Sequence, residues 1–173
     1  MMTTTFTIIF TVLLSAAILY FIIHHYRKLR KAKSLCDTAF RDVEILQDQL
    51  ISRSTPAITI TQKVLRDEEE LFEKLKPLYS PVEGPLSLET RIHNILLLRN
   101  KLNYLRKRAQ KHPELKYDAE LNTLWVKIDI TNRNIDESAS FYNDAVHDYR
   151  EMISQFPSSM LAEILQYPNY HRI

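Results

Sequence analysis

A single glycine, Gly84, in a chain of 173 residues restricts the folds open to this protein more than any other feature. Phosphate-binding loops, nucleophile elbows and dinucleotide-binding fingerprints need glycine where the backbone takes positive φ or closely approaches a ligand. Helices rarely need positive φ, and they accept Leu, Lys, Arg and Glu at low cost. The sequence therefore predicts an all-α fold and argues against the P-loop, Rossmann and α/β-hydrolase classes.

The cysteine count and the charge balance exclude further classes. Cys36 is the one cysteine, so no intramolecular disulfide can form and a zinc site would lack its other thiolates. The chain has 23 Lys and Arg against 21 Asp and Glu, a net charge of +2. A balance so close to zero gives no general case for nucleic-acid binding, and we expect no nucleic-acid partner.

An uncharged apolar run, FTIIFTVLLSAAILYFII, extends from Phe6 to Ile23. As a helix it is about 27 Å long, close to the roughly 30 Å hydrocarbon core of a bilayer. A cleaved signal peptide is the alternative, but no Lys or Arg precedes the run and no small-x-small site ends it. We favour a transmembrane helix over residues 6–23, preceded by a short extracytoplasmic tail, residues 1–5.

A basic flank follows this run directly and sets its expected orientation. Its cations are Arg27, Lys28, Arg30, Lys31 and Lys33. The positive-inside rule predicts a single-pass protein of the cell (inner) membrane, with its N-terminus outside and the remaining chain cytoplasmic. A topology signal alone accounts for the five cations. The alternative is that they also contact anionic lipid headgroups, each worth on the order of 1 kcal/mol.

Beyond the span, apolar residues at spacings of three and four predict an antiparallel, up-and-down four-helix bundle over residues 24–157. The transmembrane helix is expected to run on to about Ser54, where Pro56 ends it. Its inward stripe includes Cys36, which we interpret as a core residue rather than a reactive thiol. A second helix is expected from about Ile58 to Lys76, followed by a loop containing Pro77, Pro81, Gly84 and Pro85.

The third helix is predicted from about residue 87 to residue 112, where Pro113 stops it. Asp118 can cap a fourth helix that ends at Phe156-Pro157. Its apolar positions recur every seven residues, at Leu121, Ile128, Ile135, Tyr142 and Tyr149. In the last segment, residues 158–173, Ser158 is expected to cap a short helix whose MLAEIL stretch either packs on the bundle or lies on lipid, and we favour packing.

A set of residues at fixed spacing between positions 113 and 157 carries a family resemblance. The set is Pro113, Leu115, Lys116, Leu124, Thr131, Ile135, Tyr142, Asn143, Val146, Tyr149, Phe156 and Pro157. It resembles the pattern of the LemA family of bacterial membrane-anchored proteins, and Leu121 and Ile128 are conservative replacements within it. The first helix is similar to the family pattern at Tyr26, Leu29, Ala39, Phe40 and Val43, whereas residues 57–111 match it only in general character.

Three positions depart from the family pattern. Asn132 stands where relatives have Glu, Ala139 where they have Arg, and Arg150 where they have a second Asn. A buried Glu–Arg pair is therefore not expected here. The resemblance implies one N-terminal span followed by a helical bundle, and it implies no settled activity. Some relatives are encoded near membrane proteases, which raises the alternative of an accessory subunit in a membrane protease or quality-control complex.

The sequence offers little support for catalysis. Asp144 and His147 form the one acid-x-x-His pair, and at 100° per residue both point away from the face of Tyr142. A carboxylate-type metal enzyme is therefore the weaker alternative, and we expect no enzyme activity, cofactor, metal site or small-molecule substrate.

The remaining candidate is a basic cluster at the end of the third helix: Arg106, Lys107, Arg108 and Lys111. The helix dipole favours cations at that end, which explains the cluster without a partner. The alternative is a docking surface, distal from the membrane, for an acidic partner. Together these features predict a membrane-anchored scaffold or adaptor whose protein partner is another copy of the chain or a membrane complex.

Overall fold

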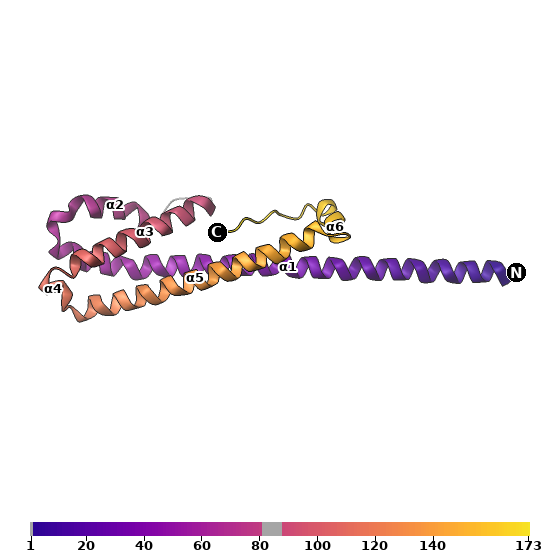
Figure 1. Cartoon of the computed structure of the whole chain (residues 1–173), viewed down its shortest axis with the longest axis horizontal. Helices are drawn as coiled ribbons and strands as arrows, with labels where there is room; N and C mark the ends of the chain where they lie inside the picture. The colour runs from indigo at the N-terminus through magenta and orange to yellow at the C-terminus, as the bar shows by residue number, and fades with distance from the viewer. Residues whose placement is uncertain (1, 81–87) are drawn as a thin grey trace. The chain divides into compact units, whose positions relative to one another are not determined.

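The computed structural model describes residues 2–80 and 88–173, and every regular element within these residues is helical. In chain order the elements are α1 (Met2–Val64), the 3₁₀ helix η1 (Arg66–Glu68), α2 (Glu69–Tyr79), α3 (Leu88–Ala109), α4 (Pro113–Lys116), α5 (Ala119–Ser154) and α6 (Ser158–Ile164) (Figure 1). The predicted all-α fold with a long apolar N-terminal helix is confirmed. The predicted loop residues Pro81, Gly84 and Pro85 lie outside the described residues.

The chain divides into two compact units, and both α1 and α5 contribute a segment to each of them. Unit 1 comprises Met1–Phe40 and Phe141–Arg172, and unit 2 comprises Arg41–Ser140 with Ile173. The predicted boundaries at residues 5 and 23 refer to a membrane, and the one at residue 157 refers to the end of the bundle. All three stay predictions.

Helix α1 does not end at Pro56, and the sequence prediction of a helix boundary there was wrong. The helix continues to Val64, so residues 58–64, assigned to a second helix, belong to the first. The missing proline N–H costs about 3 kcal/mol in a helix interior. Burial of Leu50, Ile58 and Leu65, all at most 1% exposed, contributes more, on the order of 1.5–3 kcal/mol each.

Hydroxyl groups next to Pro56 satisfy carbonyls within this part of the helix. Ser54 Oγ donates to the carbonyl of Leu50 over 2.6 Å, and Thr55 Oγ1 donates to that of Ile51 over 2.9 Å. Such side-chain bonds to the preceding turn are common within helices. They do not reach the carbonyl of Ser52, which lacks its usual donor at Pro56, so it is the burial on either side of Pro56 that carries the helix through it.

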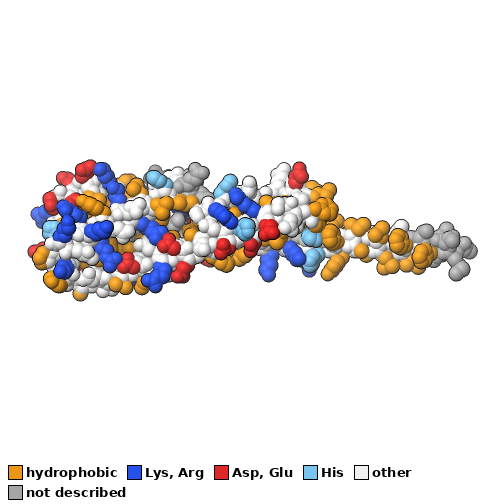
Figure 2. Space-filling model, in the orientation of Figure 1, with side chains coloured by type: hydrophobic (Ala, Val, Ile, Leu, Met, Phe, Trp, Pro, Cys, Tyr) orange, Lys and Arg blue, Asp and Glu red, His pale blue; other side chains and the backbone are white. Residues whose placement is uncertain are grey.

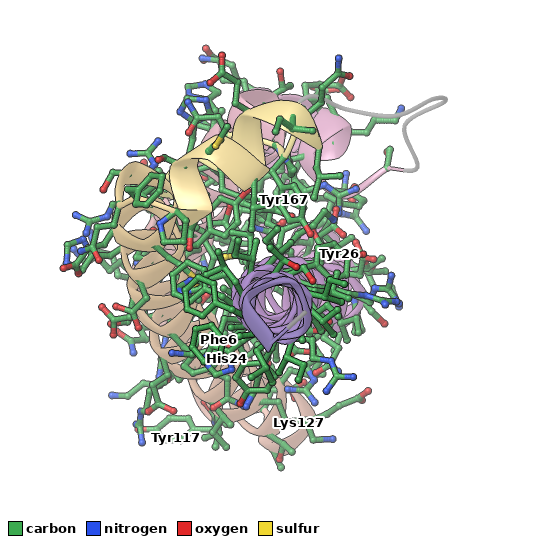
Figure 3. All side chains as sticks on the ribbon, turned by 90° about the vertical axis from the view of Figure 1, so that its right-hand side faces the viewer. Phe6, His24, Tyr26, Tyr117, Lys127 and Tyr167 are labelled. Atoms are coloured by element: carbon green, nitrogen blue, oxygen red, sulfur yellow. The ribbon has the colours of Figure 1, made fainter. Side chains whose placement is uncertain are left out.

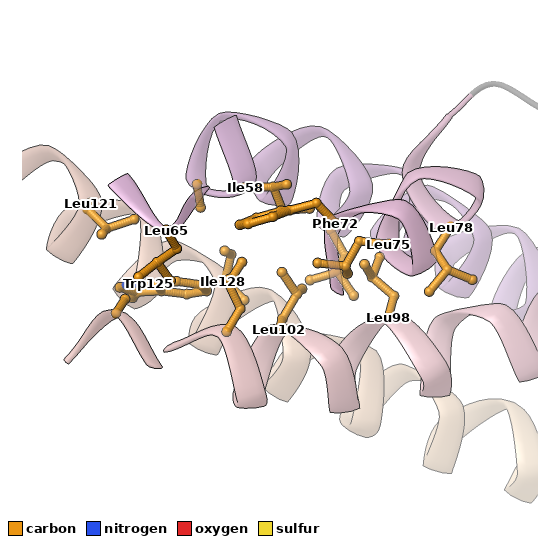
Figure 4. Close-up of a cluster of buried hydrophobic side chains, with 14 of the residues drawn as sticks. Ile58, Leu65, Phe72, Leu75, Leu78, Leu98, Leu102, Leu121, Trp125 and Ile128 are labelled. Carbon is orange, nitrogen blue, oxygen red and sulfur yellow. The ribbon is translucent and has the colours of Figure 1, made fainter. Parts of the chain in front are cut away.

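The core of unit 2 is built from four helical segments, as the predicted bundle requires. Buried residues from the end of α1, from α2, from α3 and from the start of α5 form one cluster. Ile58, Phe72, Leu102 and Trp125 point toward one another at its centre (Figure 4). α2 extends past the predicted end at Lys76 to Tyr79, with Pro77 inside it, because Leu75 and Leu78 continue its buried face.

Polar contacts fix the ends of these segments. Asp118 caps α5 as predicted, because its Oδ1 accepts a hydrogen bond from the backbone N–H of Leu121 over 2.7 Å. α3 ends at Ala109, and Pro113 occupies the first turn of the short helix α4, where its missing N–H costs nothing.

Unit 1 pairs the first part of α1 with the last part of α5. The inward faces predicted from the sequence are confirmed: Leu29, Cys36, Tyr142, Val146 and Tyr149 are at most 2% exposed. The Cys36 thiol donates to the carbonyl of Ala145 over 3.4 Å, and the rings of Phe40 and Tyr142 lie 5.6 Å apart. Both small and aromatic side chains therefore pack across this helix pair.

Helix α6 differs from the prediction in two respects. Pro157 holds the N-cap position, and Ser158, expected as the cap, lies inside the helix with its side chain 5% exposed. Met160, Ile164 and Leu165 were expected to pack on the bundle, but they are exposed. The face of α6 that turns inward carries Ser158 and the partly buried Leu161, so Met160, Ile164 and Leu165 are left on the outer face.

Candidate functional site

The most elaborate polar site in unit 1 forms where the C-terminal residues 167–172, which we call the strap, lie against α1 and α5. α6 ends in a six-residue C-capping turn, with Gln166 in the left-handed conformation (φ 50°) and the Tyr167 N–H donating to Ala162 over 3.0 Å. This turn reverses the chain, and the strap then follows α5 without forming a helix (Figure 1).

Side chains of α5 hold the strap through its main-chain oxygens. The Tyr149 hydroxyl donates to the Pro168 carbonyl over 2.7 Å, and the Tyr142 hydroxyl donates to the His171 carbonyl over 3.0 Å. Arg150 Nε donates to the Tyr170 carbonyl over 2.9 Å. The two buried tyrosines of the heptad pattern thus have partners for their hydroxyls, and a residue that departs from the family pattern supplies the third bond.

Tyr170 is the strap side chain that reaches furthest into unit 1. Its ring lies edge-on to that of Tyr149, with centroids 5.1 Å apart, and its hydroxyl donates to the Asp37 carboxylate. Asp37 also pairs with Lys33 over 2.7 Å. The last residues of the chain are in this way connected to α1 as well as to α5.

Burial changes the acid–base properties of this cluster. It raises the pKa of the Cys36 thiol to about 11, with the Asp37 charge adding to the effect, and it raises the pKa of Tyr149 to about 12. The pKa of Tyr170 is raised by burial and by its hydrogen bond to Asp37. These groups stay protonated near neutral pH, so the cluster holds hydrogen-bond donors and offers neither a thiolate nor a phenolate nucleophile.

The predicted basic flank lies mostly on the surface. Arg27, Lys28, Arg30 and Lys31 are exposed, whereas Lys33 is partly buried and pairs with Asp37. Four of the five candidates for headgroup contact are therefore accessible. Lys28 also lines an open groove of about 310 Å³ together with residues of α5 and the start of α6.

The basic cluster at the end of α3 is divided between partly buried, paired residues and exposed ones. Arg106 forms a two-oxygen contact with the Asp129 carboxylate at 2.8 and 2.9 Å and lies 5.8 Å from the centre of the Trp125 ring. Arg108 pairs with Glu68 in η1. Lys107 and Lys111 are exposed. Two members of the cluster hold α3 to neighbouring elements, and the other two present charge to solvent.

The acid-x-x-His pair lies where the helical periodicity placed it. Asp144 and His147 are both exposed on α5, as predicted. Among the described residues, no group of three or more His, Cys, Asp or Glu side chains is arranged to hold a metal ion.

Comparison with known protein families identifies a match. A family model described as the LemA family matches residues 55–172, which includes the segment between positions 113 and 157 and all of α2 and α3. The similarity noted between Tyr26 and Val43 lies outside the matched range. No curated protein and no solved structure matches the chain.

Proposed function

The chain belongs to the LemA family, and on that premise we propose that it is a membrane-anchored helical scaffold that works by binding proteins and not by catalysis. The continuity of α1 carries this proposal. The helix is long and apolar enough to cross a membrane, and the side chains of its apolar window are exposed. The same helix continues into a bundle without a linker, which is a direct way to hold a binding surface at a bilayer.

The charge pattern supports an orientation for this anchor. The exposed cations Arg27, Lys28, Arg30 and Lys31 follow the apolar segment directly, and positively charged flanks are retained on the cytoplasmic side. The proposed arrangement is a single pass through the inner membrane of a bacterium, with the N-terminus outside and both α5 and the bundle in the cytoplasm.

The chemistry of the buried polar groups supports a non-catalytic role. Cys36 is 0% exposed and has a raised pKa, and the tyrosine hydroxyls of α5 are committed to the strap. A general base or nucleophile needs a pKa near the working pH and access to substrate. The Cys36 thiol and the tyrosine hydroxyls of α5 meet neither condition.

For the protein partner we propose a docking surface at Lys107 and Lys111, which would favour an acidic segment. Arg106 and Arg108 contribute to this surface by fixing the end of α3, and their own charges are compensated by Asp129 and Glu68. The partner is a second copy of the chain or a component of a membrane complex.

Photo-crosslinking in native membranes tests the proposal. A benzophenone amino acid is placed at Lys107 or Lys111 in the full chain, with the exposed position Arg133 on α5 as the matched control. We expect a protein adduct from the first two positions that disappears when the other lysine is changed to Glu. Equal adducts from all three positions would refute a specific surface, and a chain that alkaline carbonate extracts from the membrane would refute the anchor.

A further inference from the structure

An exposed apolar surface lies at the start and on the outer face of α6. Its members are Phe156, Met160, Ile164 and Leu165, which are 80%, 58%, 66% and 45% exposed. Hydrophobic side chains gather over α6 beside the apolar part of α1 in the space-filling view (Figure 2). An apolar cluster of this kind on a short helix marks a contact with something other than water.

The surface is held in a fixed place within unit 1. At the N-terminal end of α6, Ser158 Oγ lies 3.4 Å from Nδ1 of His25 on α1. At the other end, the capping turn at Gln166 leads into the strap, whose carbonyls are bound by α5. α6 is therefore fastened at both ends, and its exposed apolar residues are not those of a loose terminus.

The position of His25 indicates the depth at which this surface lies in a bilayer. His25 lies two residues past Ile23, the end of the uncharged run, which is about 3 Å along a helix. The headgroup layer is roughly 5–8 Å thick on each side of the hydrocarbon core. If α1 spans the membrane as proposed above, the start of α6 lies within the headgroup layer.

The orientation of α6 also suits an interface. Viewed from the N-terminal end of α1, α6 runs across the view beside α1 with its side toward the viewer (Figure 3). Helices that bind a lipid surface lie in the plane of the interface with apolar side chains directed into it. An axis that crosses that of a membrane-spanning helix has this orientation.

The neighbouring charges complement lipid headgroups. His25 and Lys28 line the groove of about 310 Å³ beside Phe156, and Asp148 and Glu151 line it from α5. Lys28 can contact lipid phosphates there. The two carboxylates suit the ammonium groups of zwitterionic lipids, so the groove fits mixed headgroups better than a purely anionic ligand.

We propose that α6, together with Phe156, is a second membrane-contacting element that inserts its apolar side chains into the bilayer surface beside the span. This inference rests on the proposed anchoring by α1. A lipid surface is a better occupant than a protein because α6 has seven residues, whereas a stable protein interface uses about 20–30 residues on each side. A bilayer surface can cover an apolar patch of any size, provided that the patch lies at the depth of the headgroup layer.

Fluorescence quenching in vesicles tests the proposal on the full chain. An environment-sensitive thiol probe is attached in phosphatidylcholine–phosphatidylglycerol vesicles to Met160→Cys, to Leu14→Cys within the span, and to Val126→Cys, an exposed position in unit 2. The unsubstituted chain measures the background from Cys36, which is buried. Lipids with a nitroxide near the headgroup or deep in the acyl chain act as quenchers.

We expect the shallow quencher to reduce emission at position 160 by about twofold or more and to leave position 126 unchanged. Ile164→Glu should abolish most of that quenching, whereas Ile130→Glu, at an exposed apolar position on α5, should not. Quenching at position 14 by the deep quencher alone, without quenching at 160, would overturn the inference and leave the anchor standing. Absence of quenching at both positions would overturn both.

One further result would also refute lipid insertion. A blue-shifted probe at position 160 that neither quencher affects would mean that protein, and not lipid, covers α6. Circular dichroism of each labelled chain confirms that its helices are retained, and Ile164→Cys provides a second position for the same measurement if Met160→Cys disturbs α6.

Discussion

Replacing Pro56 by alanine tests the reasoning that packing carries α1 through a residue that should end a helix. Pro56 is exposed, so the substitution removes no core contact. It restores an N–H that can donate to the carbonyl of Ser52, four residues earlier. The intrinsic preference for alanine over proline is about 3 kcal/mol in a helix interior. The hydroxyls of Ser54 and Thr55 bond the carbonyls of Leu50 and Ile51, so they do not replace the bond that Ser52 lacks. We expect a gain of about 1–3 kcal/mol.

The single tryptophan makes this gain measurable in unit 2. Trp125 is 4% exposed in the core to which Leu50, Ile58 and Leu65 also belong, so its fluorescence reports unfolding of that core. In nonionic detergent the urea midpoint should rise by roughly 1 M, since the urea dependence of small domains is about 1–3 kcal/mol per molar. Ser52→Ala, at an exposed position of the same helix, is the control and should change little. An unchanged or lower urea midpoint for Pro56→Ala would show that proline does not destabilise this helix.

Three further predictions concern the capping residue and the buried cluster of unit 1. Asp118→Ala should lower the free energy of unfolding of unit 2 by about 1 kcal/mol, measured by the same tryptophan transition, because the Leu121 N–H loses its acceptor. Cys36 should resist alkylation at pH 8 in the folded chain and react promptly after denaturation, as followed by mass spectrometry, and equally fast reaction in both states would contradict its burial. The pKa of Tyr149 is raised from 10.0 to about 12, so the stability that its neutral hydroxyl supplies should be complete below pH 10 and lost as the pH rises through 12. An alkaline titration of helix content should show this loss, and Tyr149→Phe should lower stability by about 1 kcal/mol at pH 8 while weakening the alkaline dependence.

The features that follow from local chemistry or helical periodicity were predictable from the sequence. Leu121, Ile128, Ile135, Tyr142 and Tyr149 repeat every seven residues, and all five are buried. A heptad read from the chain specifies a helix face whatever packs against it. The cap at Asp118 was predictable for the same reason, since its acceptor and donor lie within one turn.

The features that were not predictable depend on contacts between distant segments. Pro56 is a local helix breaker. Burial of apolar side chains on either side of it outweighs this effect, and that burial exists only after the bundle forms. The ion pair of Arg106 with Asp129 joins residues on separate helices that no spacing rule connects. The helix dipole explained why cations gather there, but it could not distinguish a solvent-facing charge from a paired one.

The strap was missed for a different reason. Its acceptors are backbone carbonyls of Pro168, Tyr170 and His171, and a carbonyl has no signature in a sequence. The available signal was indirect: two tyrosines on a predicted inward face need partners for their hydroxyls. That requirement indicated that something polar lies there, but not that the end of the same chain supplies it.

The way the strap is held has a practical consequence for engineering this protein. Because side chains of α5 bond main-chain oxygens, substitutions at exposed strap positions such as Asn169 leave the acceptors in place. A deletion at that position moves the carbonyls of Tyr170 and His171 out of register. The C-terminus should therefore tolerate changes of sequence better than changes of length. A reporter or affinity tag fused after Ile173 needs a flexible spacer, so that the tag does not displace the strap from α5.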